Sequence, residues 1–356
     1  MPTALIAEDS RVTQTVIRKF LEEIGFDIVA EVDNGLDAVK KTQTLHPDLV
    51  IMDLIMPKME GLTALEQIMR TCPTRIILIS AYGANYADAA FTALEQGAID
   101  FISKYSGNEY STTSFKEKLQ TKAKIALNAK LVGQRYTSRG INISHSLKRE
   151  NKPIFQTQQL IVIGASTGGP KVIQDILSNL IPPFPPVIVI QHLPIGFSSA
   201  FAERLDRGSR LNVVEAQKNM TLKSSTVYVA PGGNHLVLEE KRNRIQVHLF
   251  KGDTINGVMP SLEPTLLSAS YYFGKNLTIV ILTGMGSDGL AGARYSKSNG
   301  AMILAQDEQS STVYGMPKAV VSEGLADIVA NPQGISSCLN ARFSARLERR
   351  IPRNDN

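Results

Sequence analysis

The sequence predicts an α/β protein with two doubly wound domains. Short runs of Val, Ile and Leu, closed by Gly, Pro or an acidic residue, alternate with amphipathic stretches in both halves of the chain. At 356 residues, the chain is too long for one ordinary hydrophobic core. A segment without periodicity separates the two halves. We therefore expect a domain over 1–124, a linker over 125–157 and a second domain over 158–349.

The first half contains five strand–helix units. The expected strands cover residues 4–9, 27–32, 48–53, 75–80 and 100–104. The helix after the first strand should bury Val12, Val16, Phe20 and Ile24, which recur at helical spacing, and it should stop at Gly25. Units of this length favour a single doubly wound sheet.

Basic residues are concentrated around the predicted linker. They are Lys116, Lys118, Lys122, Lys124, Lys130, Arg135, Arg139, Lys148, Arg149 and Lys152. One interpretation is contact with an acidic partner or nucleic acid, and the other is a solvated linker. We favour the linker because no aromatic interleaving or nucleic-acid motif accompanies the charge. No nucleic-acid partner is therefore expected.

The second half resumes the alternation of strands and helices. The expected strands cover residues 160–164, 187–191, 212–216, 226–230, 277–283 and 301–305. The stretch 230–239 places Gly232-Gly233-Asn234 between β-rich runs, which favours a hairpin inserted in this domain.

Composition and termini exclude several classes of protein. No apolar run approaches the roughly 20 residues that a membrane-spanning helix needs, and Met1 and Pro2 lead into TALIA without a basic region. Cys72 and Cys338 are too few and too far apart for a disulfide framework or a metal site. We expect a cytoplasmic protein without membrane insertion.

Three residues that a hydrolase needs follow predicted strands of the second half. They are Ser166, His192 and Asp288. Because ligands bind beyond the carboxyl ends of parallel strands, the hydroxyl, imidazole and carboxylate are expected to meet at one edge of the sheet. Ser166 would attack a substrate, His192 would take its proton, and Asp288 would orient and stabilise the imidazolium.

Each of these residues also has a plainer structural interpretation. Ser166 or Thr167 could cap the next helix, a lone histidine at a strand end is commonly structural, and an aspartate among glycines is commonly an Asx-turn residue. Thr167 and Ser287 are alternative hydroxyls, and His235 is an alternative base that turn chemistry explains better. The shared sheet edge favours the hydrolase. The order Ser–His–Asp matches none of chymotrypsin, subtilisin or the α/β-hydrolases.

A second cluster of polar residues follows the strands of the first half. Glu8, Asp9, Asp53, Ser80 and Lys104 come at the ends of four of its strands. Carboxylates brought together without a counter-charge are expected to hold a hard cation, and Mg²⁺ is the best candidate. A carboxylate beside Mg²⁺ can accept a phosphoryl group, which Lys104 and Ser80 would then contact.

The segments AEDS, IMDLIMPKMEGL, ILISA and DFISK resemble the motifs of response-regulator receiver domains, which have a flavodoxin-like fold. The resemblance implies that Asp53 is the phosphoacceptor. It assigns Mg²⁺ binding to Glu8, Asp9 and Asp53. It assigns the phosphorylation switch to Ser80, Phe101 and Lys104.

The segments GASTGGP, QHLPIGFSSAFAERLD, APGGNHL, LTGMGSDGLAG and AQDEQSSTVYGMPKAV, with the receiver before them, closely resemble the chemotaxis response-regulator protein-glutamate methylesterases. The resemblance implies a doubly wound, mostly parallel methylesterase domain and a triad of Ser166, His192 and Asp288. Thr167 and the backbone N–H of Met285 would assist at the oxyanion or the substrate. The catalytic domain would need no cofactor.

The same resemblance implies the reaction and its partners. The substrate would be a γ-glutamyl methyl ester on a chemoreceptor, hydrolysed to glutamate and methanol through an acyl-enzyme, and glutamines could be deamidated at the same site. A chemotaxis sensor histidine kinase would supply the phosphoryl group. The unphosphorylated receiver would cover the catalytic cleft, and a monomer would carry out this adaptation step of a two-component chemotaxis system.

Two stretches depart from the family pattern. Met259-Pro260-Ser261-Leu262-Glu263 stands where an Arg-Pro-Ser-Val-Asp-like stretch is usual, and the linker is unfamiliar. The contacts of the usual Arg and Asp, and the packing of the two domains, are therefore open. Two alternative functions follow. One is a phosphorylation-dependent binding module with a silent hydrolase site, and the other is the same hydrolysis on a receptor outside chemotaxis.

Overall fold

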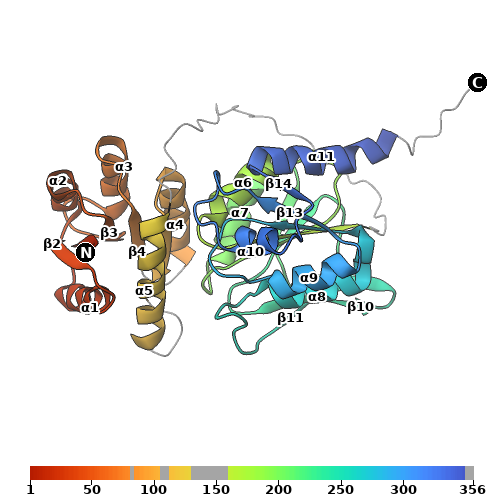
Figure 1. The fold of residues 1–356 in the computed structure, drawn as a ribbon, viewed down its shortest axis with the longest axis horizontal. Coiled ribbons are helices and arrows are strands. Elements are labelled where there is room, and N and C mark those ends of the chain that lie inside the picture. The colour runs from red at the N-terminus through yellow and green to blue at the C-terminus, as the bar shows by residue number, and fades with distance from the viewer. Residues whose placement is uncertain (81–83, 105–111, 130–158, 349–356) are drawn as a thin grey trace, which may run out of the picture.

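The computed structural model describes residues 1–80, 84–104, 112–129 and 159–348 of the chain. Two parallel sheets, each flanked by helices, form the two halves of the molecule, and a separate two-stranded hairpin lies in the second half (Figure 1). The predicted α/β class is confirmed. Among the residues that the structure describes, no helix combines the length and hydrophobicity needed to cross a bilayer.

The first sheet has the flavodoxin-like strand order β2-β1-β3-β4-β5, and all its pairings are parallel. Its strands are β1 (Thr3–Ala7), β2 (Asp27–Val32), β3 (Leu49–Asp53), β4 (Ile76–Ser80) and β5 (Asp100–Ser103). The two central strands β3 and β4 are buried throughout, as their continuous apolar runs require.

Five helices cover this sheet. They are α1 (Arg11–Glu22), α2 (Gly35–Leu45), α3 (Gly61–Thr71), α4 (Ala84–Gln96) and α5 (Thr112–Asn128). The predicted buried face of α1 is partly wrong, because Val12 is 77% exposed while Ile17, Phe20 and Leu21 are buried. Four-residue steps drift by about 40° each around a helix, so Val12 has rotated away from the face that Phe20 buries. Ile24 lies beyond the end of α1.

Helix α5 continues to Asn128, a few residues into the segment predicted as linker. Two of its basic residues make ion pairs within the first domain, Lys116 with Glu23 and Lys122 with Asp100. The rest of the predicted linker, with the basic residues from 130 to 152, lies outside the described residues.

The second sheet has seven parallel strands in the order β14-β13-β12-β6-β7-β9-β8. Its strands are β6 (Leu160–Ala165), β7 (Val187–Gln191), β8 (Asn212–Glu215), β9 (Thr226–Val229), β12 (Leu277–Ile281), β13 (Met302–Gln306) and β14 (Ile328–Ala330). The chain leaves β6 toward β7 on one side and later returns to β12 on the other. This reversal is a topological switch point, where α/β proteins bind ligands. Strand β14 was not predicted, because it is short and only partly buried.

Helices and the hairpin cover the two faces of this sheet. The helices are α6 (Gly169–Ser178), α7 (Ser198–Gly208), α8 (Leu262–Phe273), α9 (Leu290–Ser298), α10 (Met316–Ser322) and α11 (Pro332–Glu348), with a 3₁₀ turn over Gly274–Asn276. One hydrophobic cluster joins α6, α7 and α11 to one face. A second cluster joins α8, α9, α10 and the hairpin to the other face.

The hairpin is formed by β10 (His235–Lys241) and β11 (Arg244–Phe250), which pair antiparallel. A hairpin here is confirmed, but its predicted turn is wrong. Arg242 and Asn243 make the turn, both with positive φ, whereas Gly232 and its neighbours precede β10. Gly232 instead permits a close approach, since a Cβ there would lie 2.4 Å from the backbone oxygen of Pro194.

The first domain packs against α6 and α7 of the second through α4 and β5 (Figure 1). Four aromatic rings fill this interface. Phe91 stacks on Phe201 with 5.1 Å between ring centroids, and Phe101 stacks on Phe197 with 4.9 Å between them. The hydrophobic cluster of the second sheet therefore continues into the first domain without a break.

Candidate active site and phosphorylation site

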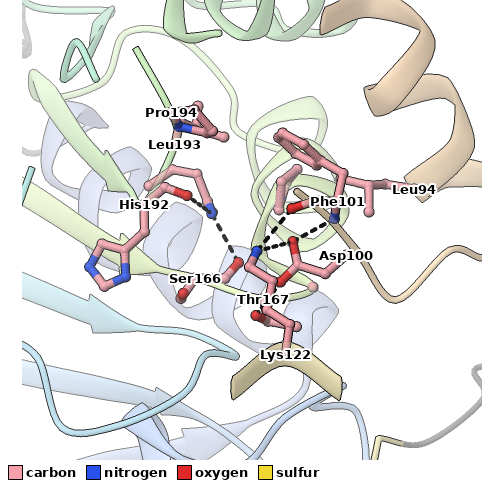
Figure 2. Close-up of a pocket in the computed structure, with 12 residues that line it drawn as sticks. Leu94, Asp100, Phe101, Lys122, Ser166, Thr167, His192, Leu193 and Pro194 are labelled. Carbon is pink, nitrogen blue, oxygen red and sulfur yellow. Dashed lines mark hydrogen bonds and ion pairs between the residues drawn. The ribbon is translucent and has the colours of Figure 1, made fainter. Parts of the chain in front are cut away.

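Ser166, His192 and Asp288 come from three neighbouring strands at the switch point. Ser166 follows β6 and His192 follows β7, the partner of β6 on one side. Asp288 lies in the turn between β12, the partner of β6 on the other side, and α9. The structure brings the last two side chains into contact and places Ser166 and His192 on the wall of one pocket (Figure 2).

The imidazole of His192 and the carboxylate of Asp288 form a buried pair. The distance from Nε2 of His192 to Oδ2 of Asp288 is 2.8 Å, and the two side chains are 10% and 3% exposed. Burial by itself would raise the pKa of Asp288, but the bond and charge of His192, with the N–H of Leu262 and the hydroxyl of Ser261, outweigh it and hold the pKa below its usual value. The carboxylate therefore stays ionised and can stabilise an imidazolium.

Three further donors fix the Asp288 carboxylate. Asn256 Nδ2 and Ser261 Oγ donate to Oδ1 at 3.1 and 2.6 Å, and the backbone N–H of Leu262 donates to Oδ2 at 2.8 Å. Together with His192 they use both carboxylate oxygens. Because both oxygens accept hydrogen bonds, the carboxylate is held in one orientation. A residue that positions an imidazole needs such a fixed orientation.

The stretch that departs from the family pattern supplies part of this support. Ser261 and Leu262 belong to it, and Glu263 accepts hydrogen bonds from the backbone N–H groups of Gly289, Ala291 and Gly292. These groups lie at the N-terminus of α9, where a carboxylate is favoured. Burial raises the pKa of Glu263, and the N–H groups oppose that rise. Glu263 thus anchors the turn that carries Asp288.

Ser166 lies on a tight turn between β6 and α6. Gly168, which caps α6, has φ of +77°, a conformation that favours glycine. Glycine is also needed at position 284, in the turn that follows β12, because a Cβ there would lie 2.8 Å from Cβ of Ser166. Met285 is the next residue of this turn. The Met285 side chain itself is 41% exposed.

The alternative residues occupy different environments. Ser287 is exposed in the turn before Asp288. His235 is fully buried, and both ring nitrogens are within hydrogen-bond distance of backbone groups, at Asp253 O and Ser261 N. A base must reach solvent or substrate, so His235 is not in a position to act as one.

Thr167 contacts the first domain. Its Oγ1 donates to Oδ2 of Asp100 at 2.5 Å, and Lys122 pairs with Oδ1 of the same carboxylate at 2.7 Å. Figure 2 shows Asp100 reaching across to the Ser166–Thr167 turn. A carboxylate of the first domain thus engages the hydroxyl next to the candidate nucleophile.

The first domain narrows the pocket around Ser166. Leu94, Asp100, Phe101 and Lys122 form one wall, and the Ser166 turn with the His192 loop forms the other (Figure 2). The remaining cavity is about 20 Å³, room for a water molecule but not for a glutamyl ester side chain. In this arrangement the first domain restricts access to Ser166 from its side.

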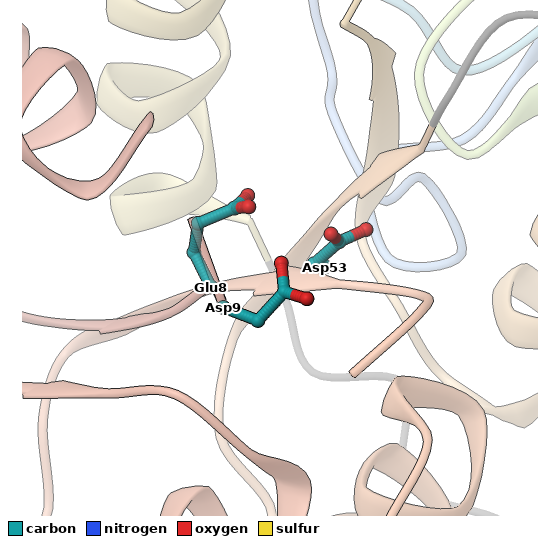
Figure 3. A group of neighbouring side chains, drawn as sticks. All are labelled: Glu8, Asp9 and Asp53. Atoms are coloured by element: carbon teal, nitrogen blue, oxygen red, sulfur yellow. The ribbon is translucent and has the colours of Figure 1, made fainter. Parts of the chain in front are cut away.

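The first domain holds an acidic cluster at the carboxyl edge of its own sheet. One carboxylate oxygen from each of Glu8, Asp9 and Asp53 lies within 4.8 Å of the others (Figure 3). Glu8 and Asp53 are buried and Asp9 is exposed. Oxygen ligands that converge from a buried floor toward an exposed rim fit a hard divalent cation such as Mg²⁺.

Lys104 follows β5 and Ser80 ends β4, at the same edge of the sheet as this cluster. The Lys104 ammonium contacts Asp53 Oδ2 at 2.6 Å and Glu8 Oε1 at 3.0 Å. Burial alone would lower the pKa of Lys104, but its bonds to the two carboxylates outweigh burial and raise the pKa. The Ser80 hydroxyl is fully buried and has no hydrogen-bond partner among the residues that the structure describes, which leaves it available to an incoming group.

Replacing Glu8 with glutamine is expected to stabilise the protein without metal and to weaken Mg²⁺ binding. Burial, with repulsion from Asp53, raises the pKa of Glu8 although Lys104 opposes the shift. Because the pKa of Glu8 is higher in the folded protein than in the unfolded chain, the free energy of unfolding decreases as the pH rises. The decrease begins near 4.5, the unfolded pKa, and is complete above the folded pKa. Calorimetry at neutral pH should show a Tm increase of a few degrees, since about 1 kcal/mol shifts a small domain by roughly 4–8 °C.

The Tm gain for Glu8→Gln should vanish at a pH well below 4.5, the pKa of Glu8 in the unfolded chain, because the carboxyl group is then protonated in both the folded and the unfolded state. Asp9→Asn serves as the matched control, because it removes an exposed member of the same cluster. It should weaken Mg²⁺ binding with little change in Tm. Equal Tm changes for both variants would contradict the assignment.

Several residues of the site were missed by the sequence reasoning. Asn256 and Ser261 donate hydrogen bonds to Asp288. Asp100 and Arg204 connect the two domains. Glu263 caps α9. Ser261 before a helix with an acidic residue two positions later is a capping signal that could have been used. The others are polar residues whose partners lie far away in sequence, and no local pattern marks them.

The fold and the two sites define a response regulator whose effector is an α/β enzyme domain. The chain belongs to the CheB methylesterase family, whose profile matches residues 161–339, and the response regulator receiver domain profile matches residues 4–113. The predicted family is thus confirmed.

Relatives resemble the chain along almost its whole length. A protein of Archaeoglobus fulgidus named protein-glutamate methylesterase/protein-glutamine glutaminase is 34% identical, over 90% of this chain and 92% of its own. One of Thermotoga maritima with the same name is 36% identical, over 91% and 94%. The crystal structure of the Thermotoga maritima CheB methylesterase catalytic domain matches with 41% identity and a TM-score of 0.51, over 51% of this chain and 97% of that one.

Proposed function

We propose that this protein hydrolyses γ-glutamyl methyl esters on chemoreceptors, deamidates receptor glutamines at the same site, and is activated by phosphorylation of Asp53. Family membership and the names of the relatives support the reaction class. The observation that carries the proposal is the His192–Asp288 pair, in which His192 lines the same small pocket as Ser166, with the receiver forming the opposite wall. The reaction takes place in the cytoplasm, in a single chain, as the adaptation step of a two-component chemotaxis system.

Ser166 starts the reaction by attacking the ester carbonyl. Nε2 of His192 is engaged by Asp288, so Nδ1 is the ring nitrogen left to take the serine proton. A bond forms between Oγ of Ser166 and the carbonyl carbon of the ester. The carbonyl oxygen becomes an oxyanion near the N-terminus of α6. The Met285 backbone N–H and Thr167 are proposed to stabilise this oxyanion.

Collapse of the tetrahedral intermediate expels methanol, which takes the proton back from His192, and leaves a glutamyl ester on Ser166. Water then attacks this acyl-enzyme with His192 again as the base, and glutamate is released. A glutamine substrate follows the same steps with ammonia as the leaving group. Asp288 remains ionised throughout and stabilises the imidazolium.

The receiver would accept the phosphoryl group on the Asp53 carboxylate from a sensor histidine kinase. Glu8 and Asp9, with Asp53, would hold Mg²⁺, which supplies positive charge to the transferring group. Lys104 is proposed to contact the new phosphoryl oxygens in place of the carboxylates it now pairs with. The buried Ser80 hydroxyl, for which the described part of the chain offers no partner, is proposed to donate to one of these oxygens.

Strand β5 connects the phosphorylation site to the closed pocket. Lys104 follows its end, while Asp100 and Phe101 on the same strand contact Thr167 and Phe197 of the catalytic domain. A shift of this strand on phosphorylation would loosen both contacts and favour the open arrangement.

The test measures methanol release from membranes whose chemoreceptors carry tritiated methyl esters. Acetyl phosphate with Mg²⁺ is expected to raise the rate of the full chain about 5- to 150-fold, the usual range of coupling between sites. Asp53→Ala should keep the basal rate and lose the stimulation, because no aspartyl phosphate can form. Stimulation that survives in Asp53→Ala would contradict the phosphoacceptor assignment, and no methanol release with or without donor would contradict the reaction.

A further inference from the structure

His235 is a buried imidazole whose hydrogen bonds join the two ends of one loop. The side chain is fully buried at the start of β10 and lies against the ring of Phe250, with 5.3 Å between centroids. Nε2 lies 3.0 Å from the backbone oxygen of Asp253, and the backbone N–H of Ser261 donates to Nδ1 at 3.2 Å. Asp253 and Ser261 are the two ends of the loop that follows the hairpin.

The partners of His235 determine its protonation state. A backbone carbonyl can only accept and a backbone N–H can only donate, so Nε2 must carry the hydrogen and Nδ1 must be unprotonated. The ring is therefore the neutral Nε2–H tautomer. A protonated Nδ1 would face the Ser261 N–H and break the connection.

The loop between these ends supports Asp288. Ile255 and Val258 exchange backbone hydrogen bonds across an Asn256-Gly257 turn, in which both residues have positive φ. The loop is thus a small closed unit whose tip and base both contact the carboxylate. Asn256 donates from the tip and Ser261 from the base.

We propose that His235 is a positioning residue for catalysis, which clamps the 253–261 loop so that the loop holds Asp288, and through it His192, in the reactive orientation. The chain of contacts runs from the imidazole through the Ser261 backbone and hydroxyl to the Asp288 carboxylate, and from there to Nε2 of His192. His235 touches no substrate and transfers no proton. This inference rests on the proposed esterase function.

The test compares two substitutions in the full chain activated with acetyl phosphate and Mg²⁺, with tritiated-methyl receptors as substrate. His235→Phe keeps a ring against Phe250 and removes both hydrogen bonds. It should lower kcat about 10- to 100-fold, the usual cost of losing an orienting partner, with KM nearly unchanged. His235→Asn can place an amide oxygen near the Nδ1 position, accept from Ser261, and recover part of kcat.

Two further measurements separate positioning from general destabilisation. Val247→Ala removes a buried side chain of the same hairpin without touching the loop, and it should lower Tm while leaving kcat unchanged. In a double-mutant cycle, Ser261→Ala and His235→Phe should cost less together than the product of their separate effects, because they act through one chain of contacts.

An unchanged kcat in His235→Phe would overturn the inference. The inference would also fail if Val247→Ala, with a Tm equal to that of His235→Phe, showed the same loss of kcat. Independent, multiplicative effects of His235→Phe and Ser261→Ala would overturn it as well. The proposed function fails differently, since the unsubstituted chain would then release no methanol at all. If His235→Phe does not fold, His235→Leu, which also removes both hydrogen bonds of the imidazole, provides the same cycle with Ser261→Ala.

Discussion

Replacing Ser166 with alanine is expected to reduce methyl-ester hydrolysis by about 10⁴- to 10⁶-fold in kcat, the loss that follows removal of a serine nucleophile from a triad. The expectation rests on the place of this hydroxyl at the switch point, in one pocket with His192, which is itself held by Asp288. The measurement is tritiated methanol release by the full chain with acetyl phosphate and Mg²⁺. Tm should change little, because Ser166 is half-buried and the substitution removes one oxygen.

Ser287→Ala is the matched control for this experiment. Ser287 is a hydroxyl near the same site, but it is exposed in the turn before Asp288. We expect its removal to leave kcat within a few-fold of the unsubstituted protein. Full turnover by Ser166→Ala, or loss of turnover only in Ser287→Ala, would transfer the nucleophile to another residue.

Replacing Arg204 with alanine is expected to raise the basal activity about 5- to 150-fold in the absence of a phosphoryl donor. Arg204 on α7 is 12% exposed and bonds to three residues of α4, namely Asp88, Thr92 and Glu95. The substitution leaves Glu95 in the interface without its cation, which destabilises the docked receiver more than the open form. The open fraction, and with it the basal methanol release, should therefore rise.

Arg207→Ala is the control for Arg204→Ala. Arg207 is on the same helix and reaches Asp88 at 3.3 Å, but its side chain is 62% exposed, and exposed ion pairs contribute little. Its basal rate should stay close to that of the unsubstituted chain. Acetyl phosphate should stimulate Arg207→Ala fully and Arg204→Ala only weakly. A basal rate that Arg204→Ala leaves unchanged would show that this cluster does not hold the pocket closed.

Local patterns predicted most of the fold. Continuous Val and Ile runs mark β3, β4, β6, β7 and β12, because strands buried on both faces need apolar residues at every position. The errors arose where side-chain placement depends on distant groups. Val12 was assigned to a face that turns to solvent. Gly232 was assigned to the turn of the hairpin, although it precedes β10 and permits a close approach to Pro194.

The sequence by itself determined the family and the residues on which the chemistry is proposed to depend. Ser166, His192, Asp288 and the acidic cluster around Asp53 all follow strands, and the ends of parallel strands meet wherever such a sheet forms. Only the tertiary structure decided how these sites are held and covered. Asp100 contacts Thr167, which lies 67 positions later in the chain, and an aspartate looks the same in sequence whether it faces solvent or another domain. The closed pocket and the loop that supports Asp288 depend on such contacts, and no local pattern encodes them.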